Sequence, residues 1–218
     1  MNIPIFCLNL ERATERRQLI QKTWINEICL NINFWKAYDR REIEKGNIIY
    51  PYSKEAAITV MGRELNYGEQ ACCTSYCMLY EYLIKESYSE VIIMEDDIYP
   101  CISNYIDLFS TIDEGKKEFP EAEIILLFQI SPTAKIKKTT NKNFTLCNQH
   151  IWGNQLVYLN KIAIQKQYDL LKKMDRVADY RIYTDNKVIL SNNPICKHLS
   201  NRDATTYIGY NKYRKFIL

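Results

Sequence analysis

The sequence predicts an α/β domain whose mostly parallel β-sheet is flanked by helices, and three features indicate this fold class. Residues 3–38 contain an apolar strand, a helix and a second strand, which is the order of a βαβ unit. The short apolar runs 91–94 and 124–128 have the length of buried strands. A chain of 218 residues suits one such domain with a sizeable core.

The N-terminal elements follow from apolar runs and helical spacing. The run 3–10 predicts the first strand, a helix begins near Thr14, and 33–38 predicts the second strand. The stretch 40–63 is punctuated by glycine and proline, and we expect loops with short helical pieces there. A long helix is expected over 68–87, because its apolar residues recur at helical spacing.

The rest of the chain continues to alternate helices and strands. In order, we expect a strand at 91–94, a helix at 102–117, a strand at 124–128, an exposed basic loop at 135–142, a strand at 154–159, a helix at 161–174 and a last short strand at 188–190.

The charge balance is close to neutral, with 29 Lys and Arg against 26 Asp and Glu. Because nucleic-acid binders usually show a basic face, no nucleic-acid partner is expected. No apolar run is long enough to cross a bilayer, and no signal peptide is recognisable, so we expect a cytoplasmic protein. The basic, aromatic tail 206–218 suits either peripheral contact with the cytoplasmic face of the inner membrane or packing on its own domain.

The eight cysteines do not suggest a disulfide framework. Cys72, Cys73 and Cys77 crowd one predicted helix, where geometry opposes mutual bridging. A domain of this length needs no covalent staples, and reduced thiols are expected. The paired CxxC spacing of a zinc site is missing as well, and only His150 and His198 supply imidazoles.

Three consecutive carboxylates, Glu95-Asp96-Asp97, follow a buried strand. Ligands of open α/β sheets bind outside the carboxyl ends of strands. In an extended chain Glu95 and Asp97 point to one side and Asp96 to the other, which predicts a seat for Mg²⁺ or Mn²⁺ that shares its coordination sphere with substrate phosphates. The alternative is a solvated acidic turn before the next helix.

A polar turn after the first strand is the second candidate. Asn9 and the guanidinium groups of Arg12, Arg16 and Arg17 surround a strand-to-helix junction, where a nucleotide or its phosphates are readily held. The alternative is ordinary polarity at a helix N-terminus beside a solvated cationic face.

These residues form part of an ordered set of blocks that resembles glycosyltransferase family 25, which includes lipooligosaccharide and collagen galactosyltransferases. The blocks match the family's I-N-L-x-R…R-R opening, its A-x-D-G turn, its G-E-x-G-C-x-x-S-H block and its L-E-D-D run. They are, in chain order, Leu8-Asn9-Leu10 with Arg12 and Arg16-Arg17; Ala37-Tyr38-Asp39; Gly68-Glu69 with Cys72 and Ser75; and Met94-Glu95-Asp96-Asp97. A weaker match surrounds Tyr158 and Ala163, with Asp179 after it.

Three positions depart from that pattern. Tyr76 stands where the family has His, Arg40 where it has Gly, and Ile162 where a Gly precedes Ala163. If the His were indispensable, Tyr76 would mean altered or lost activity. On a helix of this spacing, Tyr76 equally suits a packing position whose hydroxyl is hydrogen-bonded, and we expect activity to be retained.

The resemblance implies a GT-A-like, Rossmann-like fold and metal-assisted, inverting transfer of galactose from UDP-galactose. The acceptor it implies is a bacterial lipooligosaccharide, lipopolysaccharide or capsular glycan, with Mn²⁺ or Mg²⁺ as cofactor. A single domain, 1–218, would bind the nucleotide sugar mainly through 1–130 and the acceptor through 131–205. The nucleotide-sugar residues implied are Asn9, Leu10, Arg12, Arg16, Ala37, Tyr38, Asp39, Ser75, Glu95 and Asp96.

Inversion needs a general base, and Asp179 is the first candidate because the family carries an Asp after its last long helix. Asp96 and Glu69 are the reserves. As alternatives, Asp179 is a helix cap or a surface ion pair, and Glu69 is a carboxylate favoured by its helix dipole.

Metal and acceptor residues complete the expected site. The metal ligands are Glu95, Asp97 and His198, although a lone His is often purely structural. The acceptor side is assigned Trp152, Gly153 and Gln129, with ordinary core packing as the alternative for Trp152.

Three rivals stay open. Glucose or N-acetylglucosamine replaces galactose if contacts to single hydroxyls differ. A non-catalytic sugar-nucleotide or glycan-binding homologue is the second, motivated by Tyr76 and Arg40. A metal-dependent nucleotidyl or phosphoryl transferase is the third, although the chain has no Walker-type loop.

Overall fold

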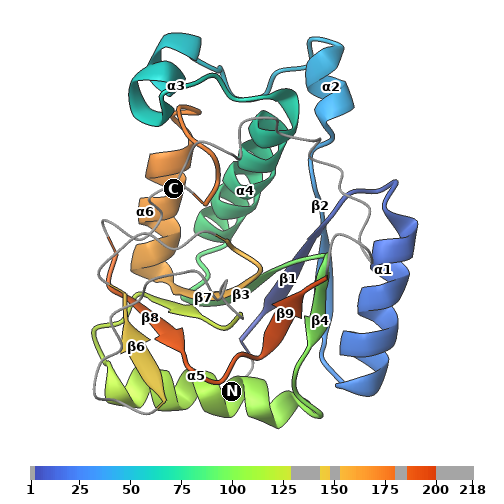
Figure 1. Ribbon diagram of the computed structural model, residues 1–218, viewed down its shortest axis with the longest axis vertical. Helices are drawn as coiled ribbons and strands as arrows, with labels where there is room; N and C mark the ends of the chain where they lie inside the picture. The colour runs from blue at the N-terminus through green and yellow to red at the C-terminus, as the bar shows by residue number, and fades with distance from the viewer. Residues whose placement is uncertain (1–2, 129–142, 148–152, 180–185, 200–218) are drawn as a thin grey trace.

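The computed structural model describes residues 3–128, 143–147, 153–179 and 186–199 of the chain. These residues form a central β-sheet, a separate pair of short strands and helices packed around them (Figure 1). The predicted α/β class is confirmed.

The described residues build a seven-stranded sheet in the order β2-β1-β3-β7-β5-β8-β6. Strands β2, β1, β3, β5 and β8 run in one direction, and β7 and β6 run against them, so the sheet is mostly parallel. The strands are β1 (Ile5–Asn9), β2 (Ile32–Lys36), β3 (Glu90–Glu95), β5 (Ile124–Leu126), β6 (Phe144–Leu146), β7 (Leu156–Asn160) and β8 (Val188–Ser191).

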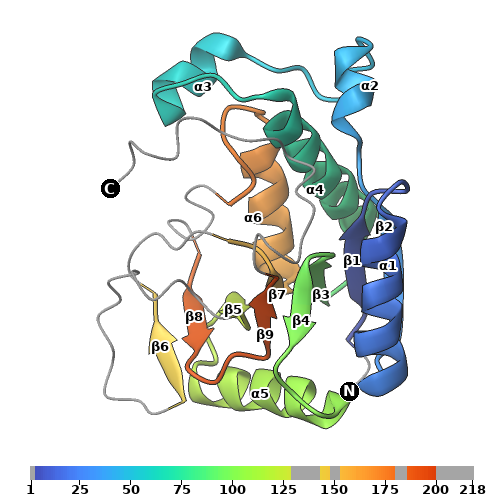
Figure 2. The same ribbon diagram turned by 45° about the vertical axis from the view of Figure 1, so that its right-hand side comes forward.

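Four longer helical segments cover the sheet. Helices α4 and α6 lie side by side, α1 runs along β1 and β2, and α5 crosses the foot of the molecule (Figures 1 and 2). Their bounds are α1 (Thr14–Ile20), continued by the π-helical turn η1 (Gln21–Glu27), α4 (Tyr67–Lys85), α5 (Tyr105–Glu118) and α6 (Lys161–Leu171). The stretch 40–63 holds α2 (Arg40–Glu44) and α3 (Lys54–Met61), as the predicted short helical pieces.

Local polar residues decide where several helices begin. Asn66 and Glu69 form a capping box at the start of α4, with each side chain accepting a backbone N–H. The Asn104 side chain caps α5, so that helix begins at Tyr105 and not at the predicted 102. Asn160 caps α6 in the same way.

The structure also contains a two-stranded sheet that was not predicted from the sequence. Strand β4 (Ile98–Pro100) follows the acidic run, and it pairs antiparallel with β9 (Cys196–His198). Strands of three residues are too short to show a two-residue period, and β6 was missed for the same reason. Consequently β8 is not the last strand, and β9 brings His198 to the end of β3.

Helix α5 packs very closely on the sheet at Gly115. A methyl group at this position would lie 3.0–3.2 Å from side-chain atoms of Ile125, Phe144 and Ile189. We expect Gly115→Leu to lower the free energy of unfolding by about 1–3 kcal/mol through overpacking. Chemical denaturation measures this, with Glu114→Leu on the exposed side of the same helix as control. Equal stability of both variants would contradict the close packing.

Within the described residues, no helix combines the length and apolar character that a membrane span requires. The tail 206–218, to which peripheral membrane contact was assigned, lies outside the described residues, and so does the basic loop 135–142.

Candidate active site

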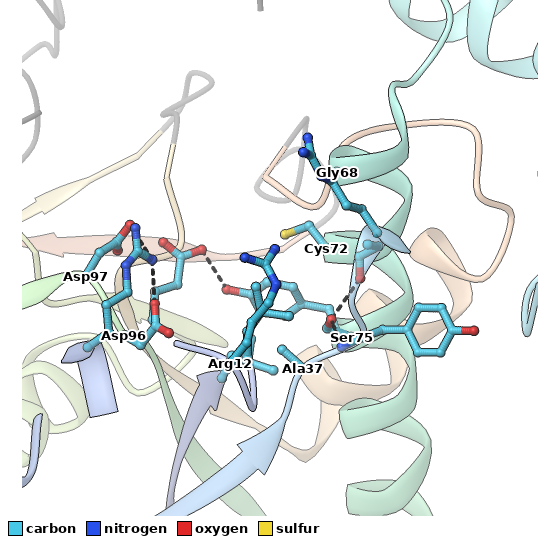
Figure 3. A pocket seen from close by; sticks show the side chains of 15 residues that line it. Arg12, Ala37, Gly68, Cys72, Ser75, Asp96 and Asp97 are labelled. Carbon is cyan, nitrogen blue, oxygen red and sulfur yellow. Dashed lines mark hydrogen bonds and ion pairs between the residues drawn. The ribbon is translucent and has the colours of Figure 1, made fainter. Parts of the chain in front are cut away.

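A cavity of about 730 Å³, counted out to its open mouth, lies at the carboxyl ends of β1 and β3 beside the first turns of α4. Figure 3 shows Asp96 and Asp97 on one side, Gly68, Cys72 and Ser75 of α4 on the other, and Arg12 between them. Of the predicted nucleotide-sugar residues, the cavity wall contains Leu10, Arg12, Arg16, Ala37, Tyr38, Ser75, Glu95 and Asp96. Segments far apart in the sequence therefore meet at one site, which suits a ligand of moderate size.

Asp96 lies at the centre of a buried polar network. Its carboxylate accepts hydrogen bonds from Asn9 Nδ2 at 2.7 Å and from Arg16 Nη1 at 2.6 Å. Burial raises the pKa of Asp96, and Arg16 and Asn9 offset part of that effect. Asn9 is thus a support behind the cavity wall, where it joins β1 to the end of β3. Because both Asp96 oxygens are engaged, the residue is poorly placed to act as a base.

Asp97 is linked to two basic side chains. Its Oδ2 lies 3.4 Å from Arg16 Nη1 and 3.3 Å from Nε2 of His198 on β9. Burial acts to raise the pKa of Asp97, but His198 and Arg16 outweigh it, and the pKa falls below its ordinary value. The predicted alternation of sides fails after Glu95, because β3 ends there and Arg16 reaches both aspartates.

Glu95 has a different environment from its two neighbours. Its Oε1 accepts a hydrogen bond from the Tyr76 hydroxyl at 3.1 Å. Burial, followed by the charges of Asp97 and Asp179, raises the pKa of Glu95 to about 8. A carboxylate held in the wall of a cavity at such a cost is a mark of a functional site.

The opposite wall is formed by the turn after β2. The backbone N–H of Tyr38 donates to Ser75 Oγ at 2.8 Å, which fastens this turn to α4. Arg12 Nε pairs with Asp39 Oδ2 at 2.5 Å, and Asp39 also caps α2. Asp39 thus holds the cavity-lining Arg12 in place without itself lining the cavity.

The candidate bases occupy unequal positions. Asp179 is half-buried and close enough to Glu95 for its charge to raise the pKa of that residue. Its segment is anchored by the hydrogen bond from Cys73 Sγ to the Arg176 carbonyl oxygen at 3.0 Å. Glu69 instead pairs with Arg63 at 2.8 Å through both carboxylate oxygens and completes the capping box of α4. Of the two, only Asp179 is among the charges that raise the pKa of Glu95.

The acceptor residues are only partly described. Trp152 and Gln129 lie outside the described residues. Gly153 has a φ of +118°, and the position of a Cβ there would clash with the Gln155 side chain at 2.3 Å. Because L side chains rarely adopt such a φ, glycine is required by the local backbone, whereas the end of the flexible Gln155 side chain could move.

The acidic residues fit a divalent cation as a partial set of ligands. Asp97 Oδ1 is buried and accepts no hydrogen bond from a neighbouring described residue, and Glu95 Oε2 also accepts none within that part of the chain. In the same part, no three His, Cys, Asp or Glu side chains converge as a metal-binding group. This arrangement suits Mg²⁺ or Mn²⁺, which takes further ligands from phosphates and water, and not a closed zinc site.

Some features of the site were not foreseen from sequence. The cavity is also lined by residues that had not been assigned to the site, namely Leu8, Arg40, Gly68, Ala71, Cys72 and Tyr76. Sequence analysis assigned His198 and Asp97 to the metal but did not foresee the ion pair between them, which depends on the pairing of β4 with β9.

The model of glycosyltransferase family 25 (LPS biosynthesis protein) matches residues 2–186. The fold is similar to the crystal structure of a glycosyltransferase involved in the glycosylation of the major capsid of PBCV-1. The TM-score is 0.51, with 10% identity over 95% of this chain and 96% of that chain.

Mouse xyloside xylosyltransferase 1, in its apo form, aligns with a TM-score of 0.42 and 11% identity over 81% of this chain and 72% of that chain. No curated protein matches the sequence. The PBCV-1 likeness supports the expected glycosyltransferase fold, and at this level of identity it supports the fold alone.

Proposed function

Since this chain belongs to glycosyltransferase family 25, we propose that it transfers a hexose from a UDP-sugar onto a lipooligosaccharide, lipopolysaccharide or capsular glycan. Galactose is the proposed sugar, and inversion is the proposed stereochemical course. One observation carries the proposal: four sequence blocks, far apart along the chain, supply most of the wall of a single cavity. Such convergence is expected of a nucleotide-sugar site at the carboxyl edge of a sheet.

Different residues of the cavity are proposed to bind different parts of the donor. Arg12, held by Asp39, and Arg16, held by Asp96, supply positive charge for the donor diphosphate. The turn at Tyr38, fastened by Ser75, forms the wall assigned to the nucleoside. Glu95 and Asp97 would hold Mn²⁺ or Mg²⁺, which would neutralise the charge that develops on the departing UDP.

Donor identity is tested by a panel of UDP-sugars with Mn²⁺, scored for UDP release with and without acceptor glycan. Highest turnover with UDP-galactose is the expected result. Preference for UDP-glucose or UDP-N-acetylglucosamine would replace the proposed sugar and keep the reaction class. Absence of both hydrolysis and transfer with every donor would favour the non-catalytic sugar-nucleotide-binding rival.

Chelation tests the cation. We expect EDTA to abolish donor turnover and excess Mn²⁺ or Mg²⁺ to restore it. The carboxylates of Glu95 and Asp97 line the cavity and would repel the leaving diphosphate unless a divalent cation lay between them. The rate of UDP release is the measurement. An undiminished rate in the chelator would remove the metal from the mechanism.

Asp179 is the proposed general base, which takes the proton of the acceptor hydroxyl. We expect Asp179→Asn to slow transfer by about 10²–10⁴-fold, the usual contribution of general-base catalysis. The rate and its pH profile are measured beside Asp169→Asn, whose half-exposed carboxylate pairs with Lys172 and serves as control. A loss below about tenfold is too small for this role.

A further inference from the structure

Tyr76 and Tyr80 are neighbouring, fully buried tyrosines on α4 whose hydroxyls differ in one respect. Their rings pack against each other with centroids 6.0 Å apart, and each side chain is at most 1% exposed. The Tyr76 hydroxyl donates to Glu95 Oε1 at 3.1 Å. The Tyr80 hydroxyl is buried without a hydrogen-bond partner among the described residues. Packing therefore accounts for both rings, but only Tyr76 has a polar contact at the site.

The three carboxylates of the acidic run are held by different means. Asp96 is fixed by Asn9 and Arg16, and Asp97 by Arg16 and His198. Within the described part of the chain, the Glu95 carboxylate accepts a hydrogen bond from Tyr76 alone. Glu95 ends β3, where its backbone still pairs with Leu8 of β1 and its N–H donates to the Gln155 carbonyl oxygen at 2.9 Å, so the strand fixes its backbone but not its carboxylate. Its orientation in the cavity wall therefore depends on the Tyr76 hydroxyl.

We propose that Tyr76 is a positioning residue, which orients the Glu95 carboxylate so that Oε2 is available to a cation–diphosphate ligand in the cavity. The inference rests on the proposed function, because it assigns Glu95 to the cation. Removing a group that hydrogen-bonds and orients a metal-binding side chain commonly lowers metal affinity by about 10–100-fold. Tyr76 thus acts through Glu95, which lines the same cavity, and its ring packs in the core as well.

Isothermal titration calorimetry tests the proposal with UDP as probe, with Mn²⁺ present and with EDTA in its place. The variants are Tyr76→Phe, Tyr80→Phe as the matched control, and Glu95→Gln. Each tyrosine variant removes one hydroxyl and keeps its ring. We expect Tyr76→Phe to reduce the Mn²⁺-dependent gain in UDP affinity by about 10–100-fold, with UDP binding in EDTA unchanged. Tyr80→Phe is expected to keep the full gain.

The three variants distinguish failure of the positioning role of Tyr76 from failure of the proposed cation site. If Glu95→Gln loses the Mn²⁺-dependent gain and Tyr76→Phe keeps it, the positioning role is overturned and the proposed site stands. If Glu95→Gln keeps the gain, the assignment of Glu95 to the cation fails, and the inference fails with it. If both tyrosine variants lose the gain equally, packing of the helix is the cause, and the hydroxyl has no special role. Thermal unfolding of each free variant confirms that binding is measured on folded protein.

Discussion

Replacing Asp97 with alanine is expected to abolish sugar transfer while leaving the fold intact. Asp97 lines the cavity, and its buried Oδ1 has no hydrogen-bond donor among neighbouring described residues, so a cation is the partner that this oxygen suits. Loss of charge neutralisation at a leaving group costs several kcal/mol, which corresponds to about a thousandfold in rate. Arg16 keeps its contact with Asp96 in the variant, so the link between α1 and the end of β3 survives.

Two measurements decide this prediction. UDP release at saturating Mn²⁺ gives the activity, and thermal unfolding followed by circular dichroism gives the state of the fold. Asp113→Ala, on the exposed side of α5, is the control for loss of an acidic residue away from the cavity. Near-normal transfer by Asp97→Ala from a metal-dependent donor would refute the assignment of Asp97 to the cation.

The sheet core was predictable because its strands are continuous apolar runs. Strands β1, β3 and β5 are buried along nearly their whole length, and a run of that kind is visible without knowledge of partners. Helix α4 was predictable from its spacing, and Asn66 with Glu69 decides its start. The predicted start of α5 lay three residues too early because the Asn104 cap was overlooked.

The pairings within the site were much less predictable than its members. Sequence reasoning named Arg16, Asp96, Asp97 and His198, but it placed Asp96 on the opposite side from Asp97. That expectation extended strand geometry past the end of β3, and a bend lies there instead. The contact of His198 with Asp97 depends on β4 and β9, whose three-residue strands carry no detectable period. Tertiary context, which local pattern does not contain, decided both.

For Tyr76, the sequence predicted burial of the ring but not the partner of its hydroxyl. The sequence left open whether this departure from the family pattern was a loss of function or a packed residue with a bonded hydroxyl. The structure has the ring in the core and the hydroxyl on Glu95. Periodicity predicted the burial, but the choice of Glu95 as partner required the distance between α4 and the end of β3.

Glu95→Gln is expected to stabilise the ligand-free protein at alkaline pH while it removes activity. The pKa of Glu95 rises from an ordinary value near 4.5 to about 8 through burial and the charges of Asp97 and Asp179. A raised pKa favours folding below about pH 4.5, and that contribution is lost as the pH rises through about 8. The glutamine amide of the variant carries no charge at any pH. The variant's advantage should therefore grow from near zero at pH 5 to the order of a few kcal/mol at pH 9.

Chemical denaturation in EDTA at pH 4, 5, 7 and 9 measures this difference. The other end of β3 provides a control of opposite sign. At Glu90, the effect of burial on the pKa is outweighed by the hydrogen bonds from Lys116 and Tyr158, so the pKa is lowered. The charge of Glu90 therefore stabilises the fold at pH values above the ordinary pKa of a glutamate. Glu90→Gln should therefore lose stability at pH 7 and 9 and approach the native protein near pH 4.

At high pH, the two variants should change the free energy of unfolding in opposite directions. That result would show that the charge of Glu90 stabilises the fold, whereas the charge of Glu95 destabilises it. Natural proteins keep such costly residues where activity requires them, and removing the charge then exchanges function for stability. If Glu95→Gln were no more stable than the native protein at pH 9, Glu95 would not be a strained carboxylate. Its place in the cavity wall would then need no functional explanation.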